Sequence, residues 1–475
     1  MALGSWKKPH PSGDFLLVIK MTKSPKSILV FREFRLCLTL MTLAVLSLLT
    51  TVAFAAGPRD PFPLYPSIKP NVAFWKKVFT QYSTRQGIIH DSRDVNIIYE
   101  VITLKDWHEP GAYSYNNAKE KYAKAHYEQL LKRLKSGDTP RSLEEERVRA
   151  LFSADKARKL LKDAHRFVRL QLGQKDRFRA GLIRSGAYID EIRKTLRAYD
   201  LPEDLAYLPH VESSFDYQAS SKCGAGGIWQ FTHSTGRRYM TINYTVDERR
   251  DPIIATHAAA RFLKENYRML QDWPTALTAY NHGPGGMLKA QRTKGDYENI
   301  FKHYNGPSFG FASRNFYSEF IAARDIARNY QAYFGDLELA NPVCREAIRL
   351  PGHATIKDLA EYFCVDIDTL KELNPSLKSS VFSGNNSVPK GFCLYLPSKI
   401  ASNPRFAADN IPSRLFKGRQ KSGRFYRVKR GDTANKIAKA HRVKLKDLIH
   451  ANRLNARATI RLGQNLRIPA REQKI

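Results

Sequence analysis

Residues 201–231 read LPEDLAYLPHVESSFDYQASSKCGAGGIWQF and carry the clearest structural signal in the chain. A proline followed by two acids is typical of the first turn of a helix, because no amide is lost there and negative charge suits the helix dipole. The helix is predicted to run to about Ser213 and to give way to a loop rich in glycine and serine. Glu212 then lies at the junction, where a carboxylate can face a cleft rather than bulk water.

Helices are expected on both sides of this stretch. Downstream, the apolar spacing and the positions of proline and glycine predict helices over 252–270, 274–280 and 314–333. Residues 200–335 are therefore expected to form one mainly helical domain. Upstream, apolar residues recur every three to four positions in 72–82, 118–134, 143–172 and 177–199. This spacing predicts a helical N-terminal region over 71–199, with a scaffolding or glycan-contacting role.

The chain is long enough for several domains and carries a large excess of positive charge. Its 475 residues suggest about three domains at roughly 150 residues each. Hydrophobic residues make up 43% of the chain, which excludes wholesale disorder. The net charge of +33 implies an anionic partner, such as nucleic acid, acidic lipid or a polymer with carboxylates. Five cysteines without a CxxC pair are too few for a disulfide scaffold and suggest no zinc or redox site.

The N-terminus is typical of an exported protein. An apolar run over 36–54 follows a basic segment and ends in the A-x-A pattern Ala53-Phe54-Ala55. We interpret 1–56 as a cleaved signal segment, with an uncleaved membrane anchor as the alternative, and the long basic segment also fits a translation start at Met21. Residues 57–70, rich in proline, are expected to be a linker. The remaining chain is predicted to work in the periplasm or cell envelope, where nucleic acid is scarce.

The C-terminal part contains one pattern twice, over 342–400 and 425–471, with a polar linker over 401–424. Each copy reads as a strand, two helices and a closing strand. The second copy contains YRVKRGDTANKIAKAHRV, DLIHANRL and LRIP, and it resembles the LysM module. The resemblance implies a βααβ unit that binds glycans containing N-acetylglucosamine. The first copy has PGHAT at 351–355 in place of the glycine-aspartate-threonine turn, so a unit that only packs against its neighbour is the alternative there.

Cysteines in the first copy suggest a cross-link. Cys344 and Cys393 are expected on its paired opening and closing strands, close enough for a disulfide in an oxidising compartment. Cys364 competes for either partner, and a buried free thiol is the other alternative.

Three stretches resemble one enzyme family. They are LPEDLAYLPHVESSFDYQASSKCGAGGIWQF at 201–231, DERRDPIIATHAAARFL at 247–263 and ALTAYNHGPGGM at 276–287. Together they resemble the lysozyme-like lytic transglycosylase domain of the murein transglycosylase D type. The resemblance implies a mainly α fold, with a lysozyme-like catalytic domain behind a helical N-terminal region and two small βααβ LysM modules.

The resemblance also implies the site. Glu212 matches the single catalytic acid. The substrate-binding residues that it implies are Ser213, Ser221, Gln230, Tyr280 and Asn281. The chain departs from the family pattern at three places, which affects the rim of the cleft: Asp216-Tyr217 replaces asparagine-proline, Thr232-His233 replaces methionine-proline, and Ala312-Ser313 replaces glutamate-threonine.

The chemistry supports the same assignment. An acid that cleaves a glycosidic bond must stay protonated near neutral pH, and burial between apolar walls raises the pKa of a carboxyl into that range. The side chains available for such walls are Phe215, Ile228, Trp229 and Phe231. Ordinary glycosidases use a second carboxylate. Asp216 is the one nearby candidate in this stretch, at a position that the family fills with asparagine, so no second catalytic carboxylate is assigned.

The expected function is cleavage of peptidoglycan between N-acetylmuramic acid and N-acetylglucosamine without water, giving 1,6-anhydromuramoyl ends. Peptidoglycan strands are the expected partner, with no nucleic acid, metal or cofactor, and with membrane association only through an uncleaved N-terminal segment. A hydrolytic muramidase and a non-catalytic peptidoglycan-binding protein are the alternatives. The zinc-deaminase pattern HxE at 210–212 lacks its downstream PCxxC, and the zinc-protease pattern HExxH does not occur.

Overall fold

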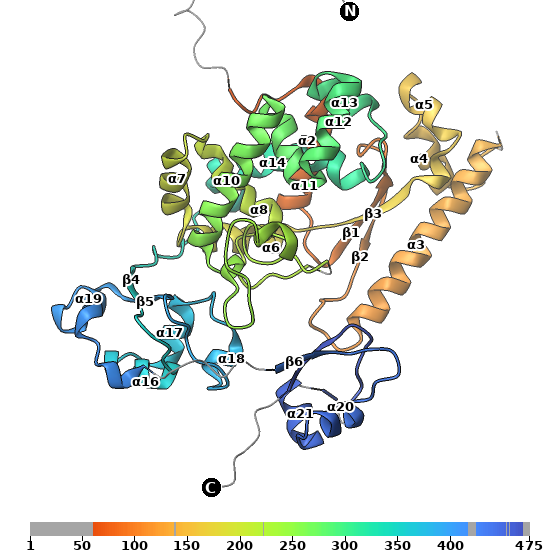
Figure 1. The fold of residues 1–475 in the computed structure, drawn as a ribbon. Helices are drawn as coiled ribbons and strands as arrows, with labels where there is room; N and C mark the ends of the chain where they lie inside the picture. The colour runs from red at the N-terminus through yellow and green to blue at the C-terminus, as the bar shows by residue number, and fades with distance from the viewer. Residues whose placement is uncertain are drawn as a thin grey trace, which may run out of the picture. The chain divides into compact units, whose positions relative to one another are not determined.

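The computed structural model describes residues 60–136, 139–221, 223–416, 424–452, 454–455 and 457–468. The signal or anchor segment expected over 1–56 lies outside these ranges. Within them, no helix combines the length and the hydropathy needed to span a bilayer. Phe62–Ile475 form one compact unit, and Figure 1 shows its described part.

The first part of this unit contains a three-stranded antiparallel sheet, so the prediction of a helical region over 71–199 is only partly right. The strands are β1 (Gln86–Asp91), β2 (Ile98–Thr103) and β3 (Val168–Leu172), in the order β2-β1-β3. The sequence IYEVIT of β2 is rich in β-branched and aromatic residues, and VRLQL of β3 alternates apolar with polar residues. The segment 143–172 was expected to be helical and instead ends in a strand.

Three helices pack beside this sheet: α3 (Ala112–Lys135), α4 (Leu143–Ala150) and α5 (Asp155–Leu161). Figure 1 shows α4 and α5 next to the C-terminal end of the long α3. Apolar side chains of the sheet and helices form a separate small core, which includes Ile89, Tyr99, Tyr127 and Leu131. One side of this sheet therefore has its own small core, whereas Ile88 of β1 and the nearby Val95 pack into the main core.

The main core is formed by helices before and after Glu212. These helices are α2 (Lys69–Thr80), α6 (Lys175–Ser185), α7 (Ile189–Ala198), α8 (Leu208–Glu212), α10 (Pro252–Leu270), α11 (Trp273–His282), α12 (Pro284–Lys294), α13 (Tyr297–His303), α14 (Phe311–Arg328) and α15 (Tyr330–Phe334), and the short α9 (His233–Gly236) lies between α8 and α10 in the chain. The helix predicted over 252–270 is α10, whose N-cap Asp251 accepts from the amides of Ile253 and Ile254. α2 is fixed to α14 because Asn71 Nδ2 donates to Asn315 Oδ1 at 2.7 Å.

The two C-terminal copies have the predicted order of strand, helix, helix and strand. The first consists of β4 (Arg345–Arg349), α16 (Ile356–Phe363), α17 (Ile367–Leu373), the short α18 (Ser379–Phe382), β5 (Cys393–Pro397) and the short α19 (Ser398–Ala401). The second consists of β6 (Arg424–Arg427), α20 (Ala434–Ala440), α21 (Leu445–Asn452) and β7 (Asn465–Ile468). In each copy the two strands pair antiparallel around a separate core.

One asparagine has the same role in both copies. Asn374 Nδ2 donates to the carbonyl oxygens of Leu370 and Tyr395, both at 2.8 Å, and its Oδ1 accepts from Tyr395 N at 2.8 Å. Asn452 makes the same three bonds, to the carbonyl four positions earlier and to the backbone of Arg467, at 2.8, 2.8 and 2.7 Å. Each amide side chain thus joins the second helix to the closing strand, which supports the internal duplication.

The predicted disulfide between Cys344 and Cys393 is wrong. Cys393 pairs with Arg349 at one end of the β4–β5 ladder, whereas Cys344 precedes Arg345 at the other end. At about 3.4 Å per residue of strand, this offset exceeds the roughly 7 Å that a disulfide can bridge. Both cysteines are free thiols, as is Cys364, which is exposed rather than buried.

The first copy is docked on the main helical domain through a buried ion pair. Arg345 Nη2 donates to Asp251 Oδ1 at 2.8 Å, and Nη1 lies 2.8 Å from Oδ2. Both side chains are almost fully buried, and the guanidinium stacks over the ring of Tyr395 at 3.8 Å. Because Asp251 also caps α10, the ion pair joins β4 to the start of that helix.

Backbone bonds extend this contact. Asp247 N donates to Ser376 O at 2.7 Å, and Lys378 N donates to Thr245 O at 2.8 Å. Residues 376–378 of the first copy therefore pair with residues 245–247 of the loop that leads into α10, in the way that two antiparallel strands pair. A packing role for this copy was the alternative to sugar binding, and these contacts favour it.

Candidate active site

The chain turns sharply directly after Glu212, the last residue of α8. Ser214 and Phe215 have left-handed backbone φ of 51° and 58°, which non-glycine residues rarely adopt. The amides of Ser213 and Phe215 both donate to the carbonyl oxygen of Pro209, at 3.0 and 3.2 Å. Phe215 is fully buried and anchors the turn in the core. The turn therefore leaves Glu212 at the surface of the core instead of within it.

α6 holds this turn from the other side. Arg184 donates to the carbonyl oxygen of Ser214 from Nε at 3.2 Å and from Nη2 at 2.7 Å. Gly181, one turn earlier on α6, comes so close that a Cβ there would lie 2.9 Å from the same oxygen. A helix from the N-terminal region thus fixes the backbone two residues beyond Glu212.

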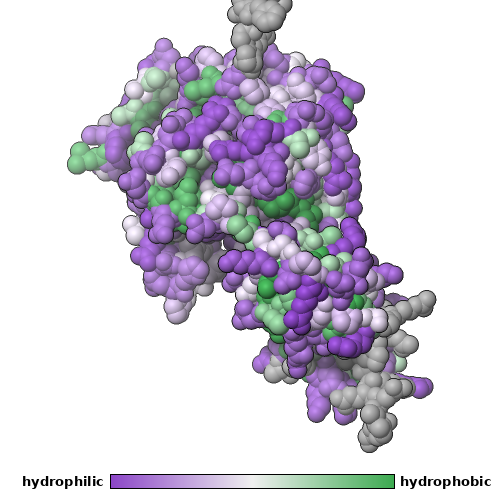
Figure 2. Space-filling view, turned by 90° about the vertical axis from the view of Figure 1, so that its left-hand side faces the viewer, coloured by the Kyte–Doolittle hydropathy of each residue, from purple (hydrophilic) through white to green (hydrophobic). Residues whose placement is uncertain are grey.

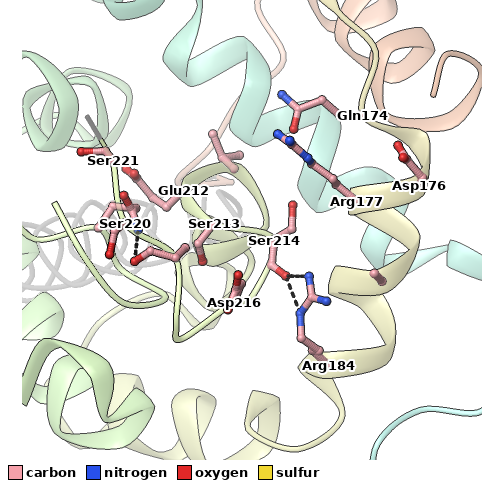
Figure 3. Close-up of a pocket in the computed structure, with 14 residues that line it drawn as sticks. Gln174, Asp176, Arg177, Arg184, Glu212, Ser213, Ser214, Asp216, Ser220 and Ser221 are labelled. Atoms are coloured by element: carbon pink, nitrogen blue, oxygen red, sulfur yellow. Dashed lines mark hydrogen bonds between the residues drawn. The ribbon is translucent and has the colours of Figure 1, made fainter. Parts of the chain in front are cut away.

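Glu212 lines a cavity of about 570 Å³ with two different walls. Residues 211–230 form one wall, and residues 174–184 of α6 and its N-cap form the other. Figure 3 shows Glu212 and Ser221 on one side and Arg177, with its side chain extending into the open space, on the other. Two segments that were expected to belong to different regions, 71–199 and 200–335, therefore share one cleft.

The environment of Glu212 favours its protonated form. Burial raises the pKa of Glu212 to about 8, and the charge of Glu319 acts in the same direction. Glu319 lies on α14, which packs against α8. Burial likewise raises the pKa of Glu319 to about 8, against the opposing charge of Arg169. Near neutral pH the cavity therefore holds a carboxylic acid that can give a proton, as general acid catalysis requires.

Comparison with known proteins identifies the domains. Residues 191–301 match the transglycosylase SLT domain family, and residues 426–469 match the LysM domain family. The chain carries a transglycosylase SLT domain and a LysM domain. The SLT match begins in α7 and ends in α13, so α6 lies outside it.

Curated relatives agree with this assignment. Membrane-bound lytic murein transglycosylase D of two Escherichia coli strains is 30% identical over 303 residues, which are 61% of this chain and 64% of the relative. The match thus spans somewhat under two thirds of these relatives. Among solved structures, the lytic transglycosylase Slt of Pseudomonas aeruginosa has a TM-score of 0.26 at 15% identity, covering 31% of this chain and 25% of that one. The 70 kDa soluble lytic transglycosylase of Escherichia coli has a TM-score of 0.26 at 17% identity, covering 33% and 27%.

The predicted fold class is confirmed: the SLT domain is a lysozyme-like helical fold, and the LysM domain is a small βααβ unit. Three of the five residues expected to bind substrate line the cavity with Glu212, namely Ser213, Ser221 and Gln230. Their side chains also shape the loop. Ser213 Oγ donates to Ile228 O at 2.9 Å, Ser221 Oγ accepts from Ala225 N at 3.0 Å, and Gln230 Nε2 donates to Gly227 O at 2.9 Å.

Tyr280 and Asn281, at the end of α11, lie outside the residues that line this cavity. Tyr280 Oη donates to the carbonyl oxygen of Trp229 at 2.9 Å, and its pKa is raised by burial and by the charge of Glu212. It therefore supports the wall behind the glutamate. Asn281 points elsewhere, since its Oδ1 accepts from Ser313 Oγ on α14 at 3.0 Å. Ser313, which stands where the family pattern has threonine, thus contacts Asn281 of the tyrosine-asparagine motif.

The four apolar residues that were expected to form walls around Glu212 are buried, but sequence reasoning missed two groups of site residues. Phe215, Ile228, Trp229 and Phe231 are all buried in the core of the SLT domain. The missed residues are Glu319 and the α6 wall that contains Gln174, Arg177 and Arg184. Asp216 was the expected nearby carboxylate and does line the cavity, with Oδ1 accepting from Gln218 N at 2.8 Å. Within the sequence, a glutamate on the buried side of the 314–333 helix was the one available signal for Glu319.

Proposed function

We propose that this chain is a peptidoglycan lytic transglycosylase that cleaves the β-1,4 bond between N-acetylmuramic acid and N-acetylglucosamine without water. The observation that carries the proposal is Glu212 itself: it lines the cavity of an SLT domain, and its pKa is raised to about 8. Ser213, Ser221 and Gln230, which line the same cavity, are the proposed sugar contacts there.

Glu212 acts twice in the proposed reaction. As the acid, it gives its proton to the oxygen that leaves from muramoyl C1. As the resulting carboxylate, it takes the proton of the C6 hydroxyl of the same muramoyl residue, and that oxygen bonds to C1. The products are a free N-acetylglucosamine hydroxyl and a 1,6-anhydromuramoyl end, and Glu212 is protonated again. No water is consumed and no net proton is taken up.

Two carboxylates near Glu212 bear on the alternative of hydrolysis, which needs a second, ionised carboxylate. Glu319 is a poor candidate, because burial raises its pKa to about 8 and it is absent from the residues that line the cavity. Asp216 lines the cavity and would be the base of a hydrolytic muramidase. Hydrolysis with Asp216 as base is therefore the second candidate function.

The mass of the soluble products separates the two reactions. After digestion of purified peptidoglycan by the chain without its first 56 residues, products ending in 1,6-anhydromuramic acid are expected. Glu212→Gln should abolish them, and Asp216→Asn should leave the type of product unchanged. Reducing muramic acid ends that disappear in Asp216→Asn would establish hydrolysis instead. Retained binding to the polymer without any product would establish the non-catalytic alternative.

The remaining features fit an enzyme of the cell envelope. LysM modules would keep the SLT domain on the polymer and raise its effective concentration there. The charge of +33 suits a polymer whose stem peptides carry carboxylates. The face in Figure 2 is mainly hydrophilic, with smaller apolar areas between, as expected for a domain that works on a hydrated polymer.

A further inference from the structure

Arg177, on the first turn of α6, is a free cation in the wall opposite Glu212. It lines the cavity and is exposed to solvent. In the described part of the chain, no carboxylate pairs with its guanidinium. The adjacent Asp176 is occupied elsewhere, since its carboxylate accepts from Thr84 N at 2.9 Å and from Thr84 Oγ1. Asp176 and Asp216 also line the cavity, but among the described residues neither forms an ion pair with Arg177, so an unpaired guanidinium faces the substrate cleft.

The surroundings of Arg177 suit an anion. Gln174 is the N-cap of α6 and lines the same cavity, but its side chain makes no capping bond, so its amide is available to a ligand. α6 has 11 residues, and its N-terminal end adds positive potential. Arg184, two helical turns further on, is not available, because it is bound to the carbonyl of Ser214. The free donors of this wall are therefore Arg177 and Gln174.

The proposed substrate carries a suitable anion next to the bond that is cleaved. Each muramoyl residue bears a lactyl group, and in peptidoglycan this group carries a stem peptide with free carboxylates. An arginine can bind a carboxylate through two parallel hydrogen bonds. We propose that Arg177 and Gln174 form a carboxylate-binding subsite that holds the lactyl-peptide arm of the muramoyl residue, so that the enzyme prefers strands that carry this anion. The proposal rests on the proposed function above.

Three substrates test it: intact peptidoglycan, strands from which an amidase has removed the peptides and left the lactyl carboxylate, and such strands with that carboxylate converted to a neutral methylamide. Arg177→Gln should lower kcat/KM about tenfold on intact polymer and leave it unchanged on methylamide strands. A loss on the amidase-treated strands would place the bound carboxylate on the lactyl group, and no loss there would place it in the peptide. On intact polymer, Arg177→Lys should lower kcat/KM by less than Arg177→Gln does.

Arg179→Gln is the matched control, because Arg179 is exposed on the same helix and does not line the cavity. An equal loss in both variants, no loss on intact polymer, or an equal loss on methylamide strands would overturn the subsite. Inactivity of the unmodified chain on intact polymer would overturn the proposed function instead. In that case, calorimetric binding of a soluble disaccharide-peptide to Glu212→Gln proteins with and without Arg177→Gln decides the subsite: equal affinities overturn it, and about tenfold weaker binding supports it.

Discussion

Arg184 on α6 binds the carbonyl oxygen of Ser214, two residues after Glu212, through two hydrogen bonds of 3.2 and 2.7 Å. Ser214 has a left-handed backbone that the local sequence does not favour. The bond from α6 fixes the carbonyl in this orientation and with it the direction in which α8 ends. The N-terminal region therefore has a positioning role for the proposed catalytic glutamate, in addition to lining the cleft.

Replacing Arg184 by Met should relax this turn. The buried carbonyl would lose a charged donor, so the free energy of unfolding should fall by about 1–3 kcal/mol. Because a small displacement of a catalytic group costs rate, kcat should fall at least tenfold while KM changes little. Chemical denaturation and turnover of peptidoglycan measure the two effects. Arg179→Met, on the exposed side of α6, should change neither quantity, and a loss in KM alone for Arg184→Met would argue against a positioning role.

Two glycines of the 220–230 loop should respond differently to alanine. Gly227 has φ of +78°, and a Cβ there would lie 1.7 Å from the carbonyl oxygen of Arg249. Gly224 has φ of +79° with nothing within 4 Å of the added atom. Gly224→Ala should therefore cost only about 1–2 kcal/mol for its backbone conformation, whereas Gly227→Ala must displace backbone and should also abolish turnover. Thermal melts and product formation compare them, and equal stability would contradict the packing of Arg249 on this loop.

Features with local signals were predictable from the sequence. Asp251-Pro252 is a strong helix start, so the bounds of α10 were expected correctly. The repeated order of a strand, two helices and a closing strand predicted the duplicated βααβ unit. The position of Glu212 at the end of a helix also followed from local chemistry.

Features that depend on packing between distant segments were not predictable. β3 was hidden because a short alternating stretch follows directly after helical segments, and its partner β1 lies about eighty residues earlier in the chain. Glu319 and Arg177 look like ordinary charged helix residues. They reach the site only because α14 packs against α8 and α6 packs against the turn after it. The place of Glu319 on the buried side of its helix could have indicated burial, but a single sequence does not indicate which segments pack together.

Arg345→Met should weaken the docking of the first βααβ copy. Asp251 would remain buried without its partner, and breaking such a pair costs about 3–5 kcal/mol. The start of α10 should loosen as well, because Asp251 caps it. Limited proteolysis between α15 and β4 and chemical denaturation should both detect the change. Arg349→Met, which changes an exposed arginine at the other end of the same strand, is the control, and equal proteolysis of the two variants would show that the ion pair does not hold the copy in place.

Glu319→Gln should change both stability and activity in a pH-dependent way. The pKa of Glu319 is raised from 4.5 to about 8 in the folded chain, so the folded state holds its proton longer than the unfolded state does. The contribution of this group to stability is complete below pH 4.5 and is lost as pH rises to about 8. Glutamine mimics the protonated form at every pH. The variant should therefore match the parent near pH 4 and melt at a higher temperature than the parent near pH 8.

The same substitution should move the alkaline limb of activity to lower pH. Glu319 raises the pKa of Glu212, so removing its charge lets Glu212 lose its proton earlier as pH rises, and a deprotonated Glu212 cannot start the reaction. Rates on peptidoglycan as a function of pH measure the shift. Glu338→Gln removes an exposed acid from the linker after α15 and should leave the profile in place. An unmoved limb in Glu319→Gln, with the stability effect present, would mean that burial alone sets the acidity of Glu212.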